Sequence, residues 1–158
     1  MIVLFILVVS SLCYWLLSPL FKDQVVSEAP IISPSTRELE NEPTRQVVSE
    51  PKIVAQGKFT GADGFHKAEG VASIIKIGDK YSVRLEDDFK VTNGPDLYVY
   101  FGKNGAYDPS AKIAVLKGNV GGQNYEVPAS LNALDYNEIW IWCRAFSVPF
   151  GSARLEVK

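Results

Sequence analysis

The feature that most constrains this fold is the spacing of apolar residues, which repeats every two positions from about Ile53 onward rather than every 3.6. Tyr81–Leu85 alternates clearly, which is typical of a strand with one buried and one wet face. The runs Val71–Ile77 and Lys80–Phe89 flank Gly78-Asp79, a two-residue loop suited to a tight hairpin. Alternation broken by short turns predicts β-strands over this part of the chain.

Further strands are predicted along the same region. They are Leu97–Phe101, Ile113–Leu116, Tyr125–Val127, Ile139–Cys143 and a final half-exposed run from Ala153 to Val157. Asn93–Asp96 and Pro149–Gly151 are interpreted as turns, and Gly102–Pro109 as a loop. Ile139–Cys143 is apolar on both faces, as expected for a central strand. About eight short strands without crossover helices predict an all-β antiparallel β-sandwich over residues 52–158 and argue against an α/β fold.

An uncharged segment, Met1–Phe21, begins the chain, and Lys22 marks the return to water. About 20 helical residues span roughly 30 Å, the thickness of a bilayer's hydrocarbon core. A cleaved signal peptide would carry basic residues before the apolar run, and a bacterial lipoprotein would have a small residue where Leu12 precedes Cys13. We expect instead an uncleaved transmembrane helix over residues 1–21. It would be a single-pass signal-anchor that holds the globular domain at the membrane, outside the cytoplasm.

Residues 22–51 are interpreted as a disordered linker, because four prolines interrupt any helix and Ser, Thr and Glu fill much of the rest. The linker contains one internal repeat. Gln24–Glu28 and Gln46–Glu50 both read Gln-Val-Val-Ser-Glu, and a proline follows each copy closely. The repeat is either a docking peptide presented twice or a duplicated spacer with no partner, and we expect the spacer.

Composition excludes several kinds of function. The net charge of −2 gives no reason to expect a nucleic-acid partner. Blue copper needs two histidines and a cysteine, and structural zinc needs four Cys/His-type ligands. The chain has one histidine, His66, and two cysteines, which is too few for either site. The only methionine is Met1, so His/Met haem ligation within the domain fails. Glu86-Asp87-Asp88 lacks the regular spacing of a calcium loop and is interpreted as a solvated acidic face. No metal site and no resident cofactor are predicted, although a borrowed haem or other redox cofactor stays open.

Two side chains remain as candidates for chemistry, Cys143 and His66. A free cysteine is among the most buried residue types and often packs as a small hydrophobe. A reactive thiolate would need a nearby cation, and Arg144 is adjacent. Neighbouring side chains on a strand point to opposite faces, so Arg144 would help only where the strand bulges or ends. His66 could pair with Cys143 if the fold brings them together, and is otherwise a surface or hydrogen-bonding residue.

Three segments of the sequence together resemble the DM13 domain. They are Gly64-Phe65-His66 with Gly70, then Gly94-Pro95-Asp96-Leu97-Tyr98-Val99, and then Trp140 to Gly151, which includes Trp142, Cys143, Arg144, Phe146 and Gly151. The resemblance covers roughly Gly57 to Val157. It implies a β-sandwich often found beside DOMON domains, with a characteristic cysteine, here Cys143, proposed to act in redox or electron transfer. It also marks His66, Gly70, Gly94, Pro95 and Asp96 as motif positions.

Two functions are therefore weighed. The first is a membrane-anchored redox or electron-transfer component that uses Cys143, with His66 as a possible partner and a separate redox protein as donor or acceptor. Because the domain has no second thiol, that chemistry would be a sulfenic acid, a mixed disulfide or ligation of a borrowed cofactor. The second is a non-catalytic envelope binding or interaction module in which Cys143 is a core residue. In neither case is the chain expected to be a stand-alone enzyme.

Overall fold

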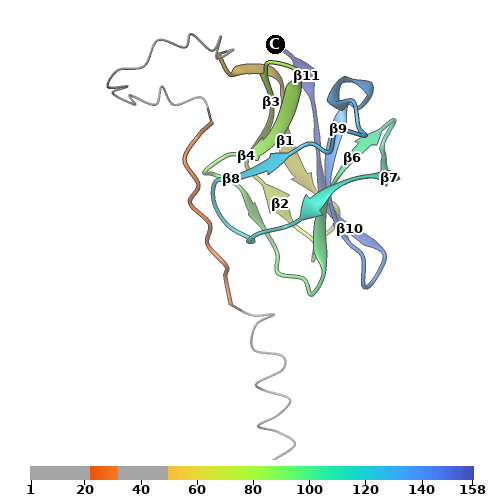
Figure 1. Ribbon diagram of the computed structural model, residues 1–158. Coiled ribbons are helices and arrows are strands. Elements are labelled where there is room, and N and C mark those ends of the chain that lie inside the picture. The colour runs from red at the N-terminus through yellow and green to blue at the C-terminus, as the bar shows by residue number, and fades with distance from the viewer. Residues whose placement is uncertain (1–21, 32–49) are drawn as a thin grey trace, which may run out of the picture.

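The structure, a computed structural model, describes residues 22–31 and 50–158, and these fold into antiparallel β-strands with almost no helix (Figure 1). The strands are β1 (Lys52–Gly61), β2 (Ala68–Glu69), β3 (Val71–Ile77), β4 (Lys80–Leu85), β5 (Lys90–Val91), β6 (Leu97–Lys103), β7 (Ala106–Val115), β8 (Gln123–Glu126), β9 (Glu138–Cys143), β10 (Val148–Arg154) and β11 (Glu156–Val157). A short 3-10 helix, η2, spans Ala133–Asp135.

Nine of the strands form one sheet that curls so that its two halves face each other. Its order is β7-β6-β9-β10-β1-β3-β4-β8, with β11 also paired to β1, while β2 and β5 form a separate two-stranded sheet. β1 joins the halves, because it pairs with β3 over Lys52–Lys58 and with β10 over Phe59–Gly61. The all-β antiparallel prediction is confirmed. The expectation of separate sandwich sheets is replaced by one continuous sheet, since β1 is long enough to belong to both halves.

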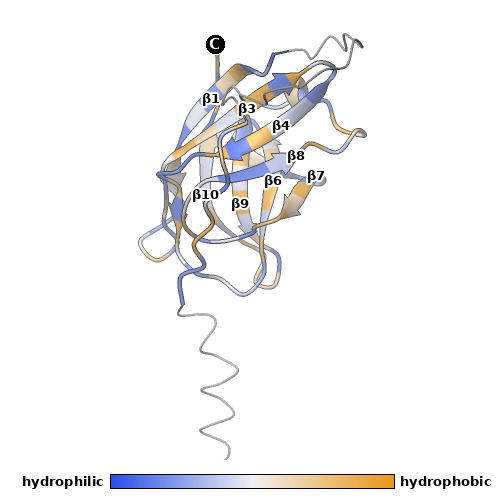
Figure 2. Cartoon of the chain, turned by 60° about the vertical axis from the view of Figure 1, so that its left-hand side comes forward, coloured by the Kyte–Doolittle hydropathy of each residue, from blue (hydrophilic) through white to orange (hydrophobic). Residues whose placement is uncertain are grey.

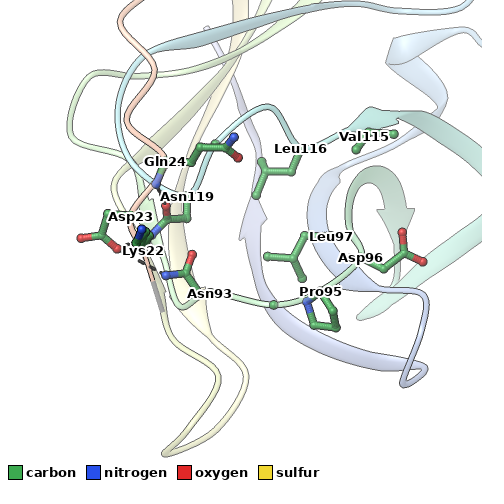
Figure 3. A pocket seen from close by; sticks show the side chains of 12 residues that line it. Lys22, Asp23, Gln24, Asn93, Pro95, Asp96, Leu97, Val115, Leu116 and Asn119 are labelled. Atoms are coloured by element: carbon green, nitrogen blue, oxygen red, sulfur yellow. Dashed lines mark hydrogen bonds between the residues drawn. The ribbon is translucent and has the colours of Figure 1, made fainter. Parts of the chain in front are cut away.

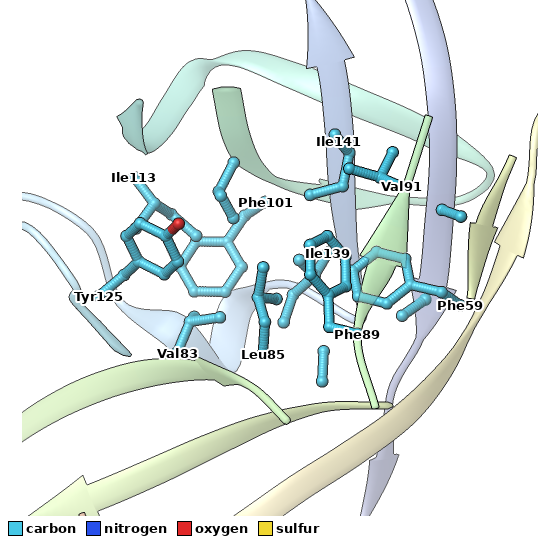
Figure 4. Packing of buried hydrophobic residues seen from close by; sticks show 14 of the residues in the cluster. Phe59, Val83, Leu85, Phe89, Val91, Phe101, Ile113, Tyr125, Ile139 and Ile141 are labelled. Atoms are coloured by element: carbon cyan, nitrogen blue, oxygen red, sulfur yellow. The ribbon is translucent and has the colours of Figure 1, made fainter. Parts of the chain in front are cut away.

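The space between the halves is filled by one apolar cluster (Figure 4). Phe59, Val83, Leu85, Phe101 and Ile139 lie in it, each less than 5% exposed. Hydrophobic and hydrophilic residues alternate along the strands that enclose the cluster (Figure 2). The alternation in the sequence therefore reports the inner and outer faces of a half-buried sheet.

Most predicted strands match the structure, and the differences lie at turns. β3 has the predicted bounds, and Gly78-Asp79 is the predicted hairpin turn between Ile77 and Lys80. The expected loop at 102–109 is instead a tight turn at Asn104-Gly105, both with positive φ, followed by strand. Pro149–Gly151 is not a turn but lies within β10, where a register shift accommodates the proline.

The predicted transmembrane helix over residues 1–21 lies outside the described residues. Within residues 22–31 and 50–158, no helix is long and apolar enough to cross a membrane. Most of the predicted linker, residues 32–49, lies outside the described residues as well.

The prediction of a disordered linker is wrong for Lys22–Ile31, which we call the strap. The strap runs in an extended conformation beside the loop that precedes β8 (Figure 1). Val25 pairs in parallel with Val120, and the amides of Val26 and Glu28 donate to the carbonyls of Val120 and Gly122, both at 2.9 Å. These main-chain bonds add a short strand to the molecule, so the first copy of the repeat acts as a docking peptide on its own domain.

Side-chain contacts also hold the strap in place. The Glu28 carboxylate accepts from Lys117 Nζ and from the Asn124 amide, both at 2.7 Å. Arg84, which is 1% exposed, donates from Nη1 to the carbonyl oxygens of Glu28 and Ala29. A buried guanidinium needs hydrogen-bond acceptors for its donors, and the strap supplies two of them to Arg84.

Replacing Glu28 by glutamine should weaken the docked strap by about 0.5–1 kcal/mol, because a partly exposed ion pair and a charge-assisted hydrogen bond are lost. Amide hydrogen exchange of the full chain measures this as reduced protection of the Val26 and Glu28 amides. The matched control is Glu50→Gln, the same residue in the second copy of the repeat, which is exposed. Equal protection in both variants would contradict the assigned role of Glu28.

The strap should also loosen in acid. The hydrogen bond from Lys117, followed by that from the Asn124 amide, lowers the pKa of Glu28 below its ordinary value of 4.5. Because the undocked carboxylate binds a proton more tightly, Glu28 stabilises docking fully above about pH 4.5 and loses this effect as the pH falls through the lowered pKa. Protection factors of the Val26 amide should fall over that range while those of Ile141 in the core hold. Glu28→Gln should abolish this pH dependence.

Candidate functional site

Cys143 is the last residue of β9 and is fully buried. It stands in register with Leu97 of β6 on one side and Val148 of β10 on the other. Residues directly opposite each other in an antiparallel pair point to the same face of the sheet, so the thiol faces inward with Leu97. Cys143 is a free cysteine within the apolar cluster, which is the environment predicted for a core residue.

Arg144 follows Cys143 but lies on the outer side of the sheet. Its amide donates to the Asp96 carbonyl, and its Nε donates to the Asp96 carboxylate, both at 3.0 Å. The guanidinium lies over the Tyr98 ring at 4.7 Å from the centroid. The hydrogen bond with Asp96 raises the pKa of Arg144. Arg144 therefore ties the end of β9 to the Gly94–Asp96 turn and does not serve as the cation of a thiolate.

His66 pairs with a carboxylate rather than with Cys143. Its Nδ1 lies 2.7 Å from Asp63 Oδ2, and its ring packs against Phe150 with centroids 4.5 Å apart. Asp63 Oδ1 accepts from the amides of Phe65 and His66, both at 2.7 Å. The hydrogen bond with the His66 side chain, followed by those from the two amides, lowers the pKa of Asp63 to about 2. This arrangement fixes the loop after β1 and leaves His66 as a structural residue of that loop.

The glycines predicted as motif positions permit close packing. A Cβ at Gly94 would meet Leu97 Cδ2 and Phe150 Cζ at 2.8 Å, so the turn can approach the core only without a side chain. Gly70 has φ +96° and lies against the backbone of Asp88 and Phe89. Gly151 lies against Ala68 and the Thr60 carbonyl. Close packing therefore explains why the motif has glycine at these three positions.

A cavity of about 480 Å³ opens beside the Gly94–Asp96 turn (Figure 3). Its apolar wall consists of Leu97, Val115 and Leu116, and its polar rim includes Asn93, Asp96 and Asn119. The remaining wall is the first part of the strap, Lys22–Gln24. The strap is held there by the Gln24 amide, which donates to Asn119 Oδ1 at 2.6 Å, and by Asp23, which accepts from Asn119 Nδ2 at 2.8 Å.

Leu97 connects this cavity with the thiol. It lines the cavity and is also the residue in register with Cys143. The structure therefore brings Pro95, Asp96, Leu97 and Arg144 together around the cavity end of β9, with Cys143 behind the apolar wall. His66 lies to one side, separated from Gly94 and Leu97 by Phe150.

Trp142 belongs to an aromatic group on the outer face of the sheet. Its ring stacks on Tyr107 with centroids 3.8 Å apart, and Tyr107 meets the Tyr100 ring edge-on at 5.3 Å. Tyr98 lies 6.2 Å from Tyr100. Sequence analysis missed this group, although the aromatic residues alternate with the inward-facing ones along both β6 and β9. Phe146, in the turn between β9 and β10, is 69% exposed.

Asp87 and Asp88 of the acidic run after β4 are exposed, as predicted, and the run also makes structural hydrogen bonds. Glu86 accepts from Arg84 Nε at 2.8 Å, and Asp87 accepts from Arg84 Nη2 at 2.6 Å. Asp88 accepts from the Val71 amide at 3.1 Å. Within residues 22–31 and 50–158, no three His, Cys, Asp or Glu side chains come together as a metal site.

Comparison with known families identifies the domain. The family model described as electron transfer DM13 matches residues 58–155, more than half of the chain. The chain belongs to the DM13 family. No curated protein and no solved structure matches it. The DM13 match contains every predicted site residue but not the strap, so one wall of the cavity comes from outside the family domain.

Burial predicts how the DM13 thiol reacts. In the full chain carrying Cys13→Ser, a small thiol reagent should modify Cys143 only through opening of the core, with the same opening free energy that hydrogen exchange gives for the Ile141 amide. Cys placed at Leu134, which is 58% exposed, should react rapidly and serves as the control. A modification rate of Cys143 that corresponds to a much smaller opening free energy than that of the core amides would show that the sulfur has its own access route.

Proposed function

We propose that this DM13 protein is a membrane-anchored component of an electron-transfer system, with its domain outside the cytoplasm and a separate redox protein as its partner. The single observation that carries the proposal is the cavity at the Gly94–Asp96 motif. Leu97 of its apolar wall stands in register with Cys143 on the neighbouring strand. The electron-transfer description of the family supports the redox part. The uncharged segment at residues 1–21 supports the anchor.

In this proposal the domain binds and positions rather than catalyses. The cavity combines an apolar wall at Leu97, Val115 and Leu116 with amide and carboxylate groups at its rim. Such sites bury an apolar group and orient it with a few polar contacts. The partner would place an exposed apolar group there, while its own cofactor carries the electron. No bond within the domain forms or breaks during the transfer.

A second function is thiol–disulfide exchange at Cys143, favoured by Leu97, which lines the cavity and stands in register with Cys143. The Cys143 thiol would lose its proton to water, and the thiolate would attack a disulfide of the partner. One partner sulfur would leave as thiolate. A different partner thiol would then attack the partner's sulfur in the mixed disulfide and release the Cys143 thiolate, so the partner's disulfide is exchanged without a net change in oxidation state. Complete burial of Cys143 weighs against this function, because a thiolate needs solvent or a cation, and Arg144 is directed to Asp96. Rapid native thiol modification would favour it over the binding role.

Filling the cavity should impair electron transfer. Val115 is 57% exposed on the cavity wall. We expect Val115→Trp to lower the electron flux from a physiological donor to an added one-electron acceptor. The flux is measured in membranes of cells whose only copy of the chain is the variant. The fold should tolerate the change because Val115 lies outside the buried core. Val157→Trp, at an 89% exposed position far from the cavity, is the matched control.

Membranes from cells without the chain set the lower limit of that flux. If wild type and the chain-free membranes give the same flux, the electron-transfer role is refuted. Deletion of residues 1–21 should move the protein to the soluble fraction and lower the flux to the same limit. A full chain that washes off membranes with alkaline carbonate would refute the anchor.

A further inference from the structure

Two phenylalanine side chains are almost fully exposed at the tips of neighbouring loops. Phe65, in the loop after β1, is 87% exposed, and Phe146, in the turn between β9 and β10, is 69% exposed. Single exposed apolar residues are ordinary on protein surfaces. Two large aromatic side chains projecting from one end of a small domain indicate that this end meets an apolar phase or partner.

The loops are built to project these rings. Asp63 Oδ1 accepts from the amides of Phe65 and His66, and the Ala62 amide donates to the His66 carbonyl at 2.9 Å. These bonds close the Phe65 loop on itself while leaving the ring outside. The Phe146 turn is closed by the pairing of Cys143 with Val148, and Ser147 adopts φ 54° within it. The exposure of both rings therefore belongs to ordered turns.

Both loops lie at the end of the domain where the strap begins. His66, next to Phe65, packs on Phe150, which lies against Gly94. Arg144, two residues before Phe146, binds Asp96. Gly94 and Asp96 form one side of the cavity, and Lys22 and Asp23 form another. In Figure 1 the start of the strap and the β9–β10 turn both lie at the lower end of the domain, on its left and right sides.

The chain preceding Lys22 determines what this end faces. Residues 1–21 contain no charged side chain. Because an extended chain advances at most about 3.6 Å per residue, Gln24 of the strap lies within roughly 11 Å of Phe21, the last residue of that segment. We infer that this end of the domain rests on the lipid bilayer, with Phe65 and Phe146 inserted at the boundary between headgroups and acyl chains. The inference rests on the anchor in the proposed function and adds an orientation to it. Aromatic side chains favour that boundary.

The charges at this end indicate that insertion is apolar rather than electrostatic. The strap begins with one lysine and one aspartate, Arg144 is paired with Asp96, and His66 is paired with Asp63. Two further lysines, Lys67 and Lys90, line a pocket together with the carboxylates of Asp23 and Glu69. A polybasic surface that would require anionic lipid is absent among the residues named for this end. Insertion should therefore be the same in zwitterionic and anionic vesicles. The orientation also places the mouth of the cavity beside the membrane.

The experiment uses the full chain with Cys13→Ser, reconstituted in phosphatidylcholine vesicles, with an environment-sensitive fluorophore at Phe65→Cys or Phe146→Cys. We expect blue-shifted emission from both positions and strong quenching when the lipid acyl chains carry bromine. Leu134→Cys is the matched control, because Leu134 is an exposed apolar side chain beside Asn132, which lies near the β3–β4 turn at the opposite end. The fluorophore at position 134 should show the emission of an aqueous environment and should not be quenched by brominated lipid.

A second variant guards against an effect of the fluorophore itself. With the label at Lys67→Cys, which is exposed near Phe65, the double change Phe65→Ser and Phe146→Ser should reduce quenching by brominated lipid. Both serines replace exposed side chains, so the fold should persist.

Three results would overturn the inference. If Phe65 and Phe146 labels report water while the chain stays in carbonate-washed vesicles, the anchor stands and the orientation fails. If the chain does not stay with the vesicles, the anchor in the proposed function fails first. Blue-shifted emission that brominated lipid does not quench would assign the two rings to contact with a second copy of the chain.

Discussion

The buried guanidinium of Arg84 holds together the parts of the structure that make the site. It is 1% exposed and donates to Glu86, Asp87, Asn124 and two strap carbonyls. A buried charge is tolerated only when its donors are satisfied, so these acceptors have to be supplied from several segments. One side chain thus joins β4, the acidic turn after it, the edge strand β8 and the strap. Arg84 holds the Glu28–Ala29 end of the strap, while Asn119 holds Asp23 and Gln24 at the cavity.

Much of the fold follows from the sequence because the core imposes an alternation on the strands around it. β4 shows it clearly, whereas β6 and β9 could be predicted as short apolar runs, as expected for central strands. β7 was predicted too short because its first half is an exposed edge, where Asp108 and Ser110 need no apolar face and Pro109 is tolerated. A turn was predicted at Pro149–Gly151, where the structure has β10, because a β-bulge lets the strand contain the proline and glycine that are typical of turns.

The site was predicted less completely, for a different physical reason. Cys143 was singled out by elimination, with Arg144 as its neighbour in sequence, and Asp96 was marked by the family resemblance. Their neighbourhood follows from the pairing of β6 with β9. The strap left no apolar pattern in the sequence, because it is bound through its main chain and one carboxylate rather than by buried side chains. Its only trace was the Gln-Val-Val-Ser-Glu repeat, which a free spacer explains equally well. Pairing of His66 with Asp63 instead of Cys143 likewise depends on a local turn that spacing does not reveal.

The strap also bears on what a shortened form of the protein would be. A fragment cut to the family match at residues 58–155 would keep the thiol and the Gly94–Asp96 turn, but it would lack Lys22–Ile31. Val120 and Gly122 would then present unpaired main-chain groups, and Arg84 would lose two acceptors. An uncovered edge of this kind invites pairing between molecules. For this protein, the smallest autonomous unit therefore begins before the family domain does, and self-association of a trimmed fragment would reflect the missing strap.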